Sequence, residues 1–543
     1  MFSAKIFDSR IKSFNVSGSE RWLGHFLAPG LLYVAYYSVG GSYLNVFYTD
    51  VLKLSNLWGG TFLMLVPIFS KIFDAFTNII MGRIIDTTRC RQGKVRPWIL
   101  ISGPLMLITG VLLYTIPQAD ANIQAIWVIV SYNLFFAFAF TMYNMSYMLQ
   151  MPLATRNAKQ RDGLAVITAM GNNMLPGMVI SMLFPMVLLP LMGVNQGRWI
   201  AVMSIASIIA LPAVLLQYYF TRERVTEEAT ESTVEIKTHT FVQQLKACFA
   251  SKYWIMIMGI FVLLRLFNIF QSLSMIYYAN WVLGTYNDGR TITLINVIGQ
   301  FPLGPGVFLL WPLVKKFGRR NITMIGFTLA AIACGLCMLQ PRNMTAVLTF
   351  MFIKSIGYLP SIGIMALLAA ALDHVEWLNG FRCDGLSAAI YTVIDTVVYG
   401  IGQGIFNMFL SRFGYVPPTA DGSWVSQNVS LQNFFVWGFF GVPMLTLLFV
   451  VFMLIFFNIE KQLPQIRTDI IARHKAEAEA RGEVYVSPEE KAAREQARLD
   501  QIAEEKRVEE LRAKCAKKGL SFDEEEAKYQ RKTAVKKAKA KKR

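Results

Sequence analysis

The chain has 543 residues, of which 54% are hydrophobic and 16% are charged, with a formal net charge of +18. Its mean hydropathy is +0.41, and this apolar excess is too large for the core of a soluble protein. The composition therefore excludes a soluble globular domain and indicates a membrane protein.

Residues 1–21 are polar and mixed in charge, without the apolar stretch of a cleaved signal, so we expect a cytoplasmic N-terminus and a first span that acts as its own insertion signal. Apolar runs of roughly 20 residues, enough to cross about 30 Å of hydrocarbon, then recur to Phe457. Only helices satisfy their own backbone in lipid at that length, so the runs predict an all-α membrane protein. We predict twelve transmembrane helices, at 23–49, 58–82, 97–117, 124–152, 164–192, 197–220, 253–283, 291–314, 321–340, 344–372, 384–411 and 432–457.

Basic residues indicate the orientation of these spans. Arg156, Lys159 and Arg161 occupy one connection, whereas alternate connections such as 117–122 carry almost no Lys or Arg. By the positive-inside rule, this asymmetry predicts that both termini lie in the cytoplasm. We expect a multi-pass protein of the plasma membrane.

A polar loop at 221–252 divides the spans into six and six. We therefore predict an N-terminal bundle at 22–220 and a C-terminal bundle at 253–458. Two related halves around a site at the midplane are typical of secondary transporters.

Residues 459–543 form a charged, Ala-rich cytoplasmic tail without an apolar run long enough for a core. Ser487 starts a capping box followed by Pro488, and Gly519 supplies a stop, which predicts a solvated helix over about 488–518. The basic end, 531–543, is suited to contact with anionic lipid or RNA, and a disordered, solvated tail is the alternative.

Ionisable side chains inside the spans are costly in lipid, so they are the first candidates for function. Lys71, Asp74 and Asn78 share one face of the second span because they are spaced i, i+3 and i+7. Asp74 is suited to bind a cation or take up a proton. Alternatively, it only neutralises Lys71.

Two further charges lie in the second half. Arg265 and Asn268 share a face of the seventh span and are suited to donate to solute hydroxyls or a carboxylate. Asp395 on the eleventh span is flanked at i−4 and i+4 by Tyr391 and Tyr399, and a carboxyl at low dielectric is a candidate proton carrier. Alternatively, Arg265 and Asp395 are partners of each other.

The fourth span carries a neutral hydrogen-bonding patch that includes Tyr143, Asn144, Tyr147 and Gln150. The sequence contains no P-loop, no paired carboxylates in a glycosidase context and no metal-binding cluster. We therefore expect no enzymatic activity and no cofactor other than a coupling ion.

Three sequence blocks carry a family resemblance. The first is Phe47-Tyr-Thr-Asp50, the second runs from Lys71-Ile-Phe-Asp74-Ala-Phe-Thr-Asn78 to Arg96-Pro-Trp98, and the third is Asp373-His-Val-Glu376-Trp-Leu-Asn-Gly380-Phe-Arg382. Over about residues 20–460 the chain resembles the glycoside-pentoside-hexuronide:cation symporter family, the melibiose-carrier branch of the major facilitator superfamily.

The resemblance implies a major facilitator fold and uptake of a sugar or glycoside, driven by Na⁺ or H⁺, through alternating access of two six-helix bundles. It places cation coupling at Asp74 and Asn78, and solute contacts at Asn144 and Thr396. The motif residues that it assigns to gating at the cytoplasmic side are Lys71, Gly82, Asp86, Arg89, Gly93, Arg96, Asp373, Glu376 and Arg382.

The chain departs from the family pattern at charged positions. The family's second cation-site acid is Asn78 here, its sugar-binding aspartate is Asn144, and its eleventh-span lysine is Thr396 beside Asp395. The family's fifth-span arginine falls at about Ala169. Because a Na⁺ cage needs several oxygen ligands whereas a proton needs one carboxyl, we expect coupling to protons, with sodium as the alternative.

The leading hypothesis is a monomeric secondary transporter for a sugar, glycoside or hexuronide, with solute contacts extending to Tyr147, Met148, Arg265, Asn268 and Tyr391. Two other classes stay open. The long tail suggests a transporter-like sensor or scaffold. The Met-rich lining around Met148 suggests a carrier of an amphipathic lipid.

Overall fold

A computed structural model describes residues 8–90, 92–155, 157–224, 240–284, 289–300, 302–419, 425–480 and 488–541. Over these ranges the regular structure is entirely helical. Arg156 and Ser487, on which two of the sequence predictions rest, lie outside the described residues.

Helices of the first part of the chain are α1 (Ala28–Gly40), α2 (Ser42–Val46), α3 (Thr61–Thr87), α4 (Arg96–Tyr114), α5 (Ala121–Asn133), α6 (Thr141–Ala154), α7 (Ala158–Met178), α8 (Leu189–Met192), α9 (Gln196–Ile208) and α10 (Ala210–Tyr219). Those of the second part are α12 (Phe241–Ala250), α13 (Lys252–Tyr278), α14 (Gly289–Gln300), α15 (Leu303–Phe317), α16 (Arg319–Leu339), α17 (Met344–Tyr358), α18 (Ile364–Asn379), α19 (Asp384–Arg412), α20 (Val429–Val436) and α21 (Val442–Phe456). The tail forms α22 (Ile459–Ala480), α23 (Pro488–Lys518) and α24 (Phe522–Lys541).

Ten helical segments in the described residues are long and apolar enough to cross a membrane. They overlap ten of the predicted spans; the segment Leu54–Thr87, for example, contains the predicted span 58–82. Large apolar side chains such as Phe69, Phe76 and Ile80 point outward from α3. The chain is therefore a multi-pass membrane protein whose outer helix faces are suited to lipid.

The other two predicted spans are broken helices. The span at 23–49 is interrupted at Gly41, where the backbone is extended between α1 and α2. The span at 291–314 is divided between α14 and α15 at Pro302, a residue that has no N–H to continue a helix. The total of twelve transmembrane helices stays a prediction.

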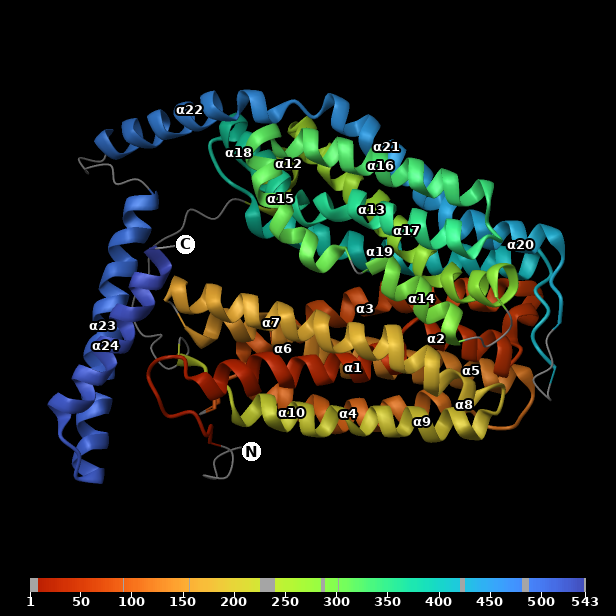
Figure 1. Ribbon diagram of the computed structural model, residues 1–543, viewed down its shortest axis with the longest axis horizontal. Coiled ribbons are helices and arrows are strands. Elements are labelled where there is room, and N and C mark those ends of the chain that lie inside the picture. The colour runs from red at the N-terminus through yellow and green to blue at the C-terminus, as the bar shows by residue number, and fades with distance from the viewer. Residues whose placement is uncertain are drawn as a thin grey trace.

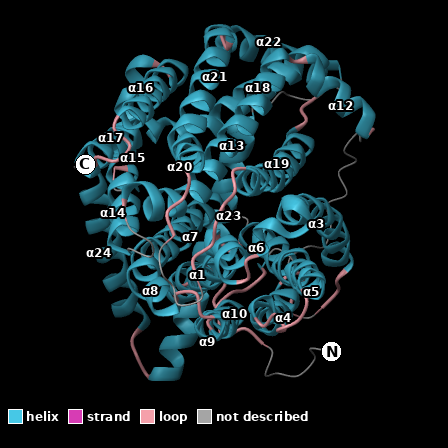
Figure 2. Ribbon diagram, turned by 90° about the vertical axis from the view of Figure 1, so that its right-hand side faces the viewer, coloured by secondary structure: helices cyan, strands magenta, loops and turns pink. Residues whose placement is uncertain are grey.

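The helices form two groups that lie side by side (Figure 1). Helices α1–α10 pack mainly on one another, as in the pairs α1–α7 and α4–α10, and α12–α21 do the same, as in α13–α21 and α16–α17. Figure 2, turned by 90°, views α3–α6 nearly along their axes. The two groups meet through α3 against α19 and through α14 against the helical segment Val179–Leu188.

Hydrogen bonds between the two groups lie near the end of the molecule away from the tail helices (Figure 1). Tyr277 on α13 is bonded to Asn45 at 3.0 Å and to Thr49 at 2.9 Å, and Tyr415 donates to Asp50 at 2.6 Å. Small residues let the helices approach closely here; a Cβ on Gly404 would lie 2.5 Å from the carbonyl oxygen of Met64. These contacts hold the two groups together at one end.

The tail helices lie across the opposite end. Helix α22 packs against α18, and α23 pairs with α24 (Figure 1). Helix α23 covers Pro488–Lys518, the range over which the capping pattern predicts a helix, while the basic end lies within α24 up to Lys541.

Candidate functional site

Asp74 lies on α3 in a buried polar cluster. One carboxylate oxygen, Oδ2, is 3.2 Å from the Nζ of Lys71, one turn earlier on the same helix. The other, Oδ1, accepts a hydrogen bond of 2.7 Å from the Thr141 hydroxyl at the start of α6. The predicted i, i+3 pair therefore forms, and α6 supplies a third partner that the sequence analysis did not find.

Arg265 on α13 and Asp395 on α19 form an ion pair of 3.0 Å. Their side chains are 31% and 40% exposed, so the pair faces open space rather than a packed core. Of the two alternatives for Arg265, the structure shows the pairing with an acid on a facing helix. The charge of Arg265 is consequently already matched by Asp395.

Tyr399 connects these two ion pairs. The Lys71 Nζ lies 5.8 Å from the centre of the Tyr399 ring, and the Arg265 Cζ lies 5.1 Å from it. Both distances are within the range of cation–π attraction. A change in the charge of either pair therefore acts directly on the same aromatic ring.

The two pairs line adjoining cavities between the helix groups. The central cavity, of about 480 Å³, is bordered by Tyr36, Arg265, Ser272, Asp395 and Tyr399. The Asp74 cavity, of about 190 Å³, shares Tyr36, Arg265, Asp395 and Tyr399 with it. The central cavity falls in the size range of small-molecule sites, about 300–1,000 Å³.

Four of the predicted site residues line the Asp74 cavity besides the charged ones: Asn78, Asn144, Met148 and Thr396. Asn144 accepts a hydrogen bond of 3.4 Å from the Tyr33 hydroxyl. The structure therefore brings α3, α6, α13 and α19 together around one space, as a solute site at the midplane requires.

The other predicted solute contacts lie elsewhere. Tyr147 accepts a hydrogen bond of 2.5 Å from Asn172 of α7. Tyr391 packs its ring against Phe261, with centroids 4.6 Å apart, and does not line either cavity. Asn268 donates a hydrogen bond of 3.2 Å to the Tyr358 hydroxyl and borders a third cavity.

The motif after α3 forms a structural clamp around Glu223. The Glu223 carboxylate accepts hydrogen bonds from the backbone N–H groups of Lys94 (2.7 Å), Val95 (3.0 Å) and Arg96 (2.9 Å). Its negative charge therefore lies at the start of α4, where the helix dipole favours it. The buried Arg96 guanidinium donates 2.8 Å to the carbonyl of Tyr218. Gly93 has φ +108°, and a Cβ there would lie 2.3 Å from the Glu223 carboxyl carbon.

The remaining residues of this motif lie outside the contacts around Glu223. Asp86 and Arg89 are exposed at the end of α3. Gly82 faces α6, where a Cβ would be 3.7 Å from the methyl group of Met145.

The motif between α18 and α19 is a charge cluster joined to the tail. Arg382 forms ion pairs with Asp373 and, at 2.8 Å, with Asp384; Glu376 lies 3.7 Å away. Burial lowers the pKa of Arg382, but the hydrogen bonds that its guanidinium donates to Asp384 and Asp373 outweigh burial and raise the pKa overall. Asp373 also accepts a hydrogen bond of 3.1 Å from Arg467 of α22, and this bond holds the tail against the second helix group.

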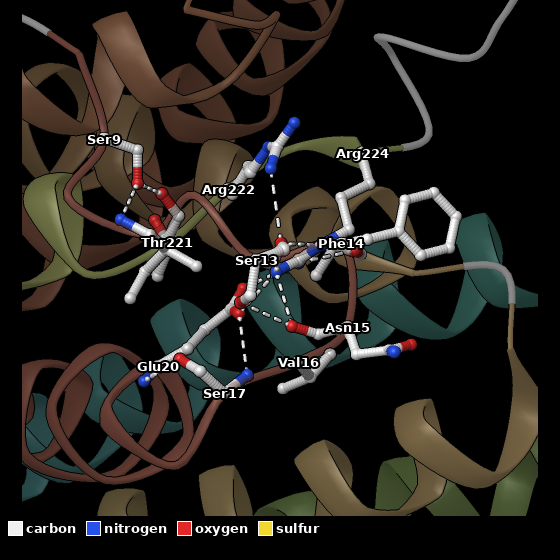
Figure 3. A network of polar contacts seen from close by, with 12 residues as sticks. Ser9, Ser13, Phe14, Asn15, Val16, Ser17, Glu20, Thr221, Arg222 and Arg224 are labelled. Carbon is white, nitrogen blue, oxygen red and sulfur yellow. Dashed lines mark hydrogen bonds and ion pairs between the residues drawn. The ribbon is translucent and has the colours of Figure 1, made fainter. Parts of the chain in front are cut away.

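The N-terminal segment is fastened beside the first helix group. Figure 3 shows Arg224 directed at the carbonyl groups of Ser13 and Asn15 and at Glu20, with which it forms a buried ion pair of 2.8 Å. Ser9 donates 2.8 Å to the carbonyl of Thr221 in the same network (Figure 3).

Helix α23 docks on this fastened segment. Asn15 donates 3.0 Å to the carbonyl of Ala503, and Asp500 accepts from Asn157 at 2.8 Å and pairs with Lys159. The tail is thus attached to both helix groups, to one through α22 and to the other through α23.

Comparisons with known proteins agree with this architecture. The model of a family described as MFS/sugar transport protein matches residues 25–461. An isoprimeverose transporter of Lactiplantibacillus pentosus is 25% identical over 447 residues, which cover 81% of this chain and 89% of that protein. A glucuronide carrier protein homologue of Escherichia coli K12 is 24% identical over 399 residues, covering 70% and 81%.

Among the solved structures with a similar fold is one that covers most of this chain. It is a bacterial homologue of the human lysosomal transporter Spinster, with a TM-score of 0.53 and 13% identity, covering 82% of this chain and 96% of that one. The family and the relatives are transporters rather than enzymes.

Proposed function

This chain belongs to the MFS/sugar transport protein family, and on that premise we propose that it is a secondary transporter that carries a sugar or glycoside across the plasma membrane by alternating access. The supporting observation is the central cavity, which lies between two helix groups that are hydrogen-bonded to each other near one end. Opening of that end and closure of the other would expose the same cavity to the opposite side of the membrane.

In this proposal the two bundles that alternate are residues 22–220 and residues 253–458, as the sequence predicts. Both termini lie in the cytoplasm. The hydrogen-bonded end then faces outward and the tail end inward. Tyrosines and two ion pairs around the cavity supply the donors, acceptors and aromatic faces that bind sugar hydroxyls and rings.

The coupling ion in this proposal is a proton bound by Asp74. The Lys71 ammonium already occupies the Asp74 carboxylate at 3.2 Å, so Na⁺ would have to displace a bound cation. A proton instead neutralises Asp74 and releases Lys71 from the pair. Because Lys71 and Arg265 share Tyr399, this release changes the electrostatics of the central cavity.

The test is uptake of a panel of labelled sugars and glycosides into proteoliposomes under an imposed pH gradient or an imposed Na⁺ gradient. We expect the pH gradient alone to drive accumulation. We expect Asp74→Asn to abolish gradient-driven accumulation while exchange of solute across the membrane continues, because only the coupling site is lost.

Asp120→Asn is the matched control, since this exposed carboxyl precedes α5 and borders none of the cavities. Asp395→Asn is measured separately. Accumulation driven by Na⁺ alone would contradict proton coupling, and accumulation retained in both Asp74→Asn and Asp395→Asn would remove both carboxyls from the mechanism.

A further inference from the structure

Lys354 is a buried cation on α17 that the transport mechanism above does not use. Its residue is 5% exposed, and among the residues that the structure describes no Asp or Glu forms an ion pair with it. Its Nζ donates 2.9 Å to the Oε1 of Gln271 on α13. A lysine at this depth without a counter-ion is costly in a membrane protein and marks a candidate functional position.

Neighbouring groups stabilise a positive charge at this point without neutralising it. The Lys354 Nζ lies 5.3 Å from the ring centre of Phe267 and 6.0 Å from that of Tyr358. The Nε2 of Gln271 is buried and has no hydrogen-bond partner. The Lys354 ammonium and the Gln271 amide N–H₂ group thus belong to hydrogen-bonded side chains that line the same cavity.

These donors border a cavity of about 310 Å³, the Lys354 cavity, whose lining also includes Asn268, Asn296 and Tyr358. It adjoins the central cavity, because Ser272, Met275 and Asn296 line both. A solute in the central cavity can thus extend one group toward Lys354.

The charges around the three cavities do not balance. Lys71 is paired with Asp74 and Arg265 with Asp395, so these four charges cancel, and the cavity linings contain no acidic side chain to match Lys354. When Lys354 is protonated, one positive charge is left over. A singly charged anionic solute would restore neutrality and accept hydrogen bonds from charged and neutral donors together.

We propose that Lys354 and Gln271 form an anion subsite that binds the acid group of the transported solute, while the neutral part of the solute occupies the central cavity. The inference rests on the proposed transport function and narrows its substrate class to organic monoanions such as sugar acids.

The experiment compares methyl β-glucuronide with methyl β-glucoside, which differ in a carboxylate against a hydroxymethyl group. Binding is measured by titration of the purified full-length protein in lipid nanodiscs, and flux is measured in proteoliposomes. We expect the wild type to bind the glucuronide at least about tenfold more tightly, as a charge-assisted hydrogen bond predicts. Lys354→Met should abolish that preference and leave glucoside binding unchanged, and Lys354→Arg should keep much of it.

Lys316→Met is the control for loss of a lysine, because Lys316 is exposed near the end of α15. Gln271→Leu, which keeps the lysine, should weaken glucuronide binding without affecting the glucoside, and it tests the subsite if Lys354→Met does not fold. Equal binding of both sugars by the wild type, or a preference that survives Lys354→Met, would overturn the inference. Binding of neither sugar would overturn it as well.

Flux separates the two claims. Transport of the glucoside without preference for the glucuronide would leave the proposed function standing and the subsite refuted. Glucuronide binding that depends on Lys354, without flux of either sugar, would support the subsite and refute the carrier.

Discussion

At the scale of single residues, the charges of Asp74 and Arg265 are each held by specific partners. Asp74 depends on Lys71 from its own helix and on Thr141 from α6. Arg265 on α13 is matched by Asp395 on α19. These pairs keep charge inside the membrane at a tolerable cost and leave it able to respond to a proton or a solute.

Gly93 is a residue at which substitution should lower stability. With φ +108° and a Cβ position 2.3 Å from the Glu223 carboxyl carbon, Gly93→Ala adds backbone strain and displaces the carboxylate that caps α4. We expect a loss of about 1–3 kcal/mol, measured as a lower unfolding temperature in detergent.

Gly163→Ala on α7 is the matched control, because a Cβ there meets no atom within 4 Å. Alanine is the better helix former, so this variant should be as stable as the wild type or slightly more stable. Equal stability of the two variants would show that Gly93 and Glu223 do not form a structural clamp.

Some of these residues follow from the sequence and others do not. The i, i+3 spacing predicts the Lys71–Asp74 pair, and the pairing of Arg265 with Asp395 is one of two alternatives that the sequence leaves open. Thr141 and Glu223 act across helices that are distant in sequence, so no local pattern identifies them. Lys354 lies within the predicted span at 344–372, so the cost of a charge in lipid marks it as a candidate from the sequence alone.

At the scale of elements, the tail is an attachment between the two helix groups rather than an isolated helix. Arg467 of α22 donates a hydrogen bond to Asp373. Asp500 of α23 accepts a hydrogen bond from Asn157 and forms an ion pair with Lys159. Alternating access requires the two groups to move relative to each other, so the contacts of α23 should report on that motion.

Asp500 provides a test of tail docking. Its pKa is lowered, first by the hydrogen bond from Lys159 and then by that from Asn157. Docking is therefore favoured above the ordinary carboxyl pKa and is lost as the pH falls through the lowered value. Asp500→Lys should shift α23 away from α7 in spin-label distance measurements, by a modest amount because an exposed pair contributes at most about 1 kcal/mol.

The charge exchange Lys159→Asp with Asp500→Lys should restore the docked distance. Glu509→Lys, which breaks only an ion pair of 2.9 Å within α23, should leave the distance unchanged. If Asp500→Lys also leaves the distance between α23 and α7 unchanged, the salt bridge does not hold the tail.

The elements themselves are largely predictable, because long apolar runs have few alternatives in a membrane. Ten predicted spans overlap helices, whereas a hydropathy window does not reveal the breaks at Gly41 and Pro302. The capping pattern predicts α23, but nothing in the sequence predicts that α23 rests on the N-terminal segment held by Arg224.

At the scale of the whole molecule, the two helix groups are fastened near one end, and the central cavity and the Asp74 cavity lie between them. The Lys354 cavity adjoins the central cavity and is lined by the second group alone. The sequence predicts two halves with a site between them, but not which end is closed, because closure depends on side-chain contacts such as Ser42 with Ser272. Alternating access, as proposed above, requires these contacts to open once in every transport cycle.

A disulfide across this closure tests that claim most directly. The hydroxyl oxygens of Ser42 on α2 and Ser272 on α13 are 2.8 Å apart, so Ser42→Cys with Ser272→Cys brings two thiols within bonding reach. Uptake of the labelled glycoside is measured in proteoliposomes after oxidation and again after reduction, with the disulfide verified by mass spectrometry. Each single-cysteine variant, oxidised in the same way, controls for the six native cysteines.

We predict that the oxidised double variant takes up no solute, that reduction restores uptake, and that both single variants stay active throughout. Undiminished uptake by the verified disulfide form would contradict alternating access through the central cavity.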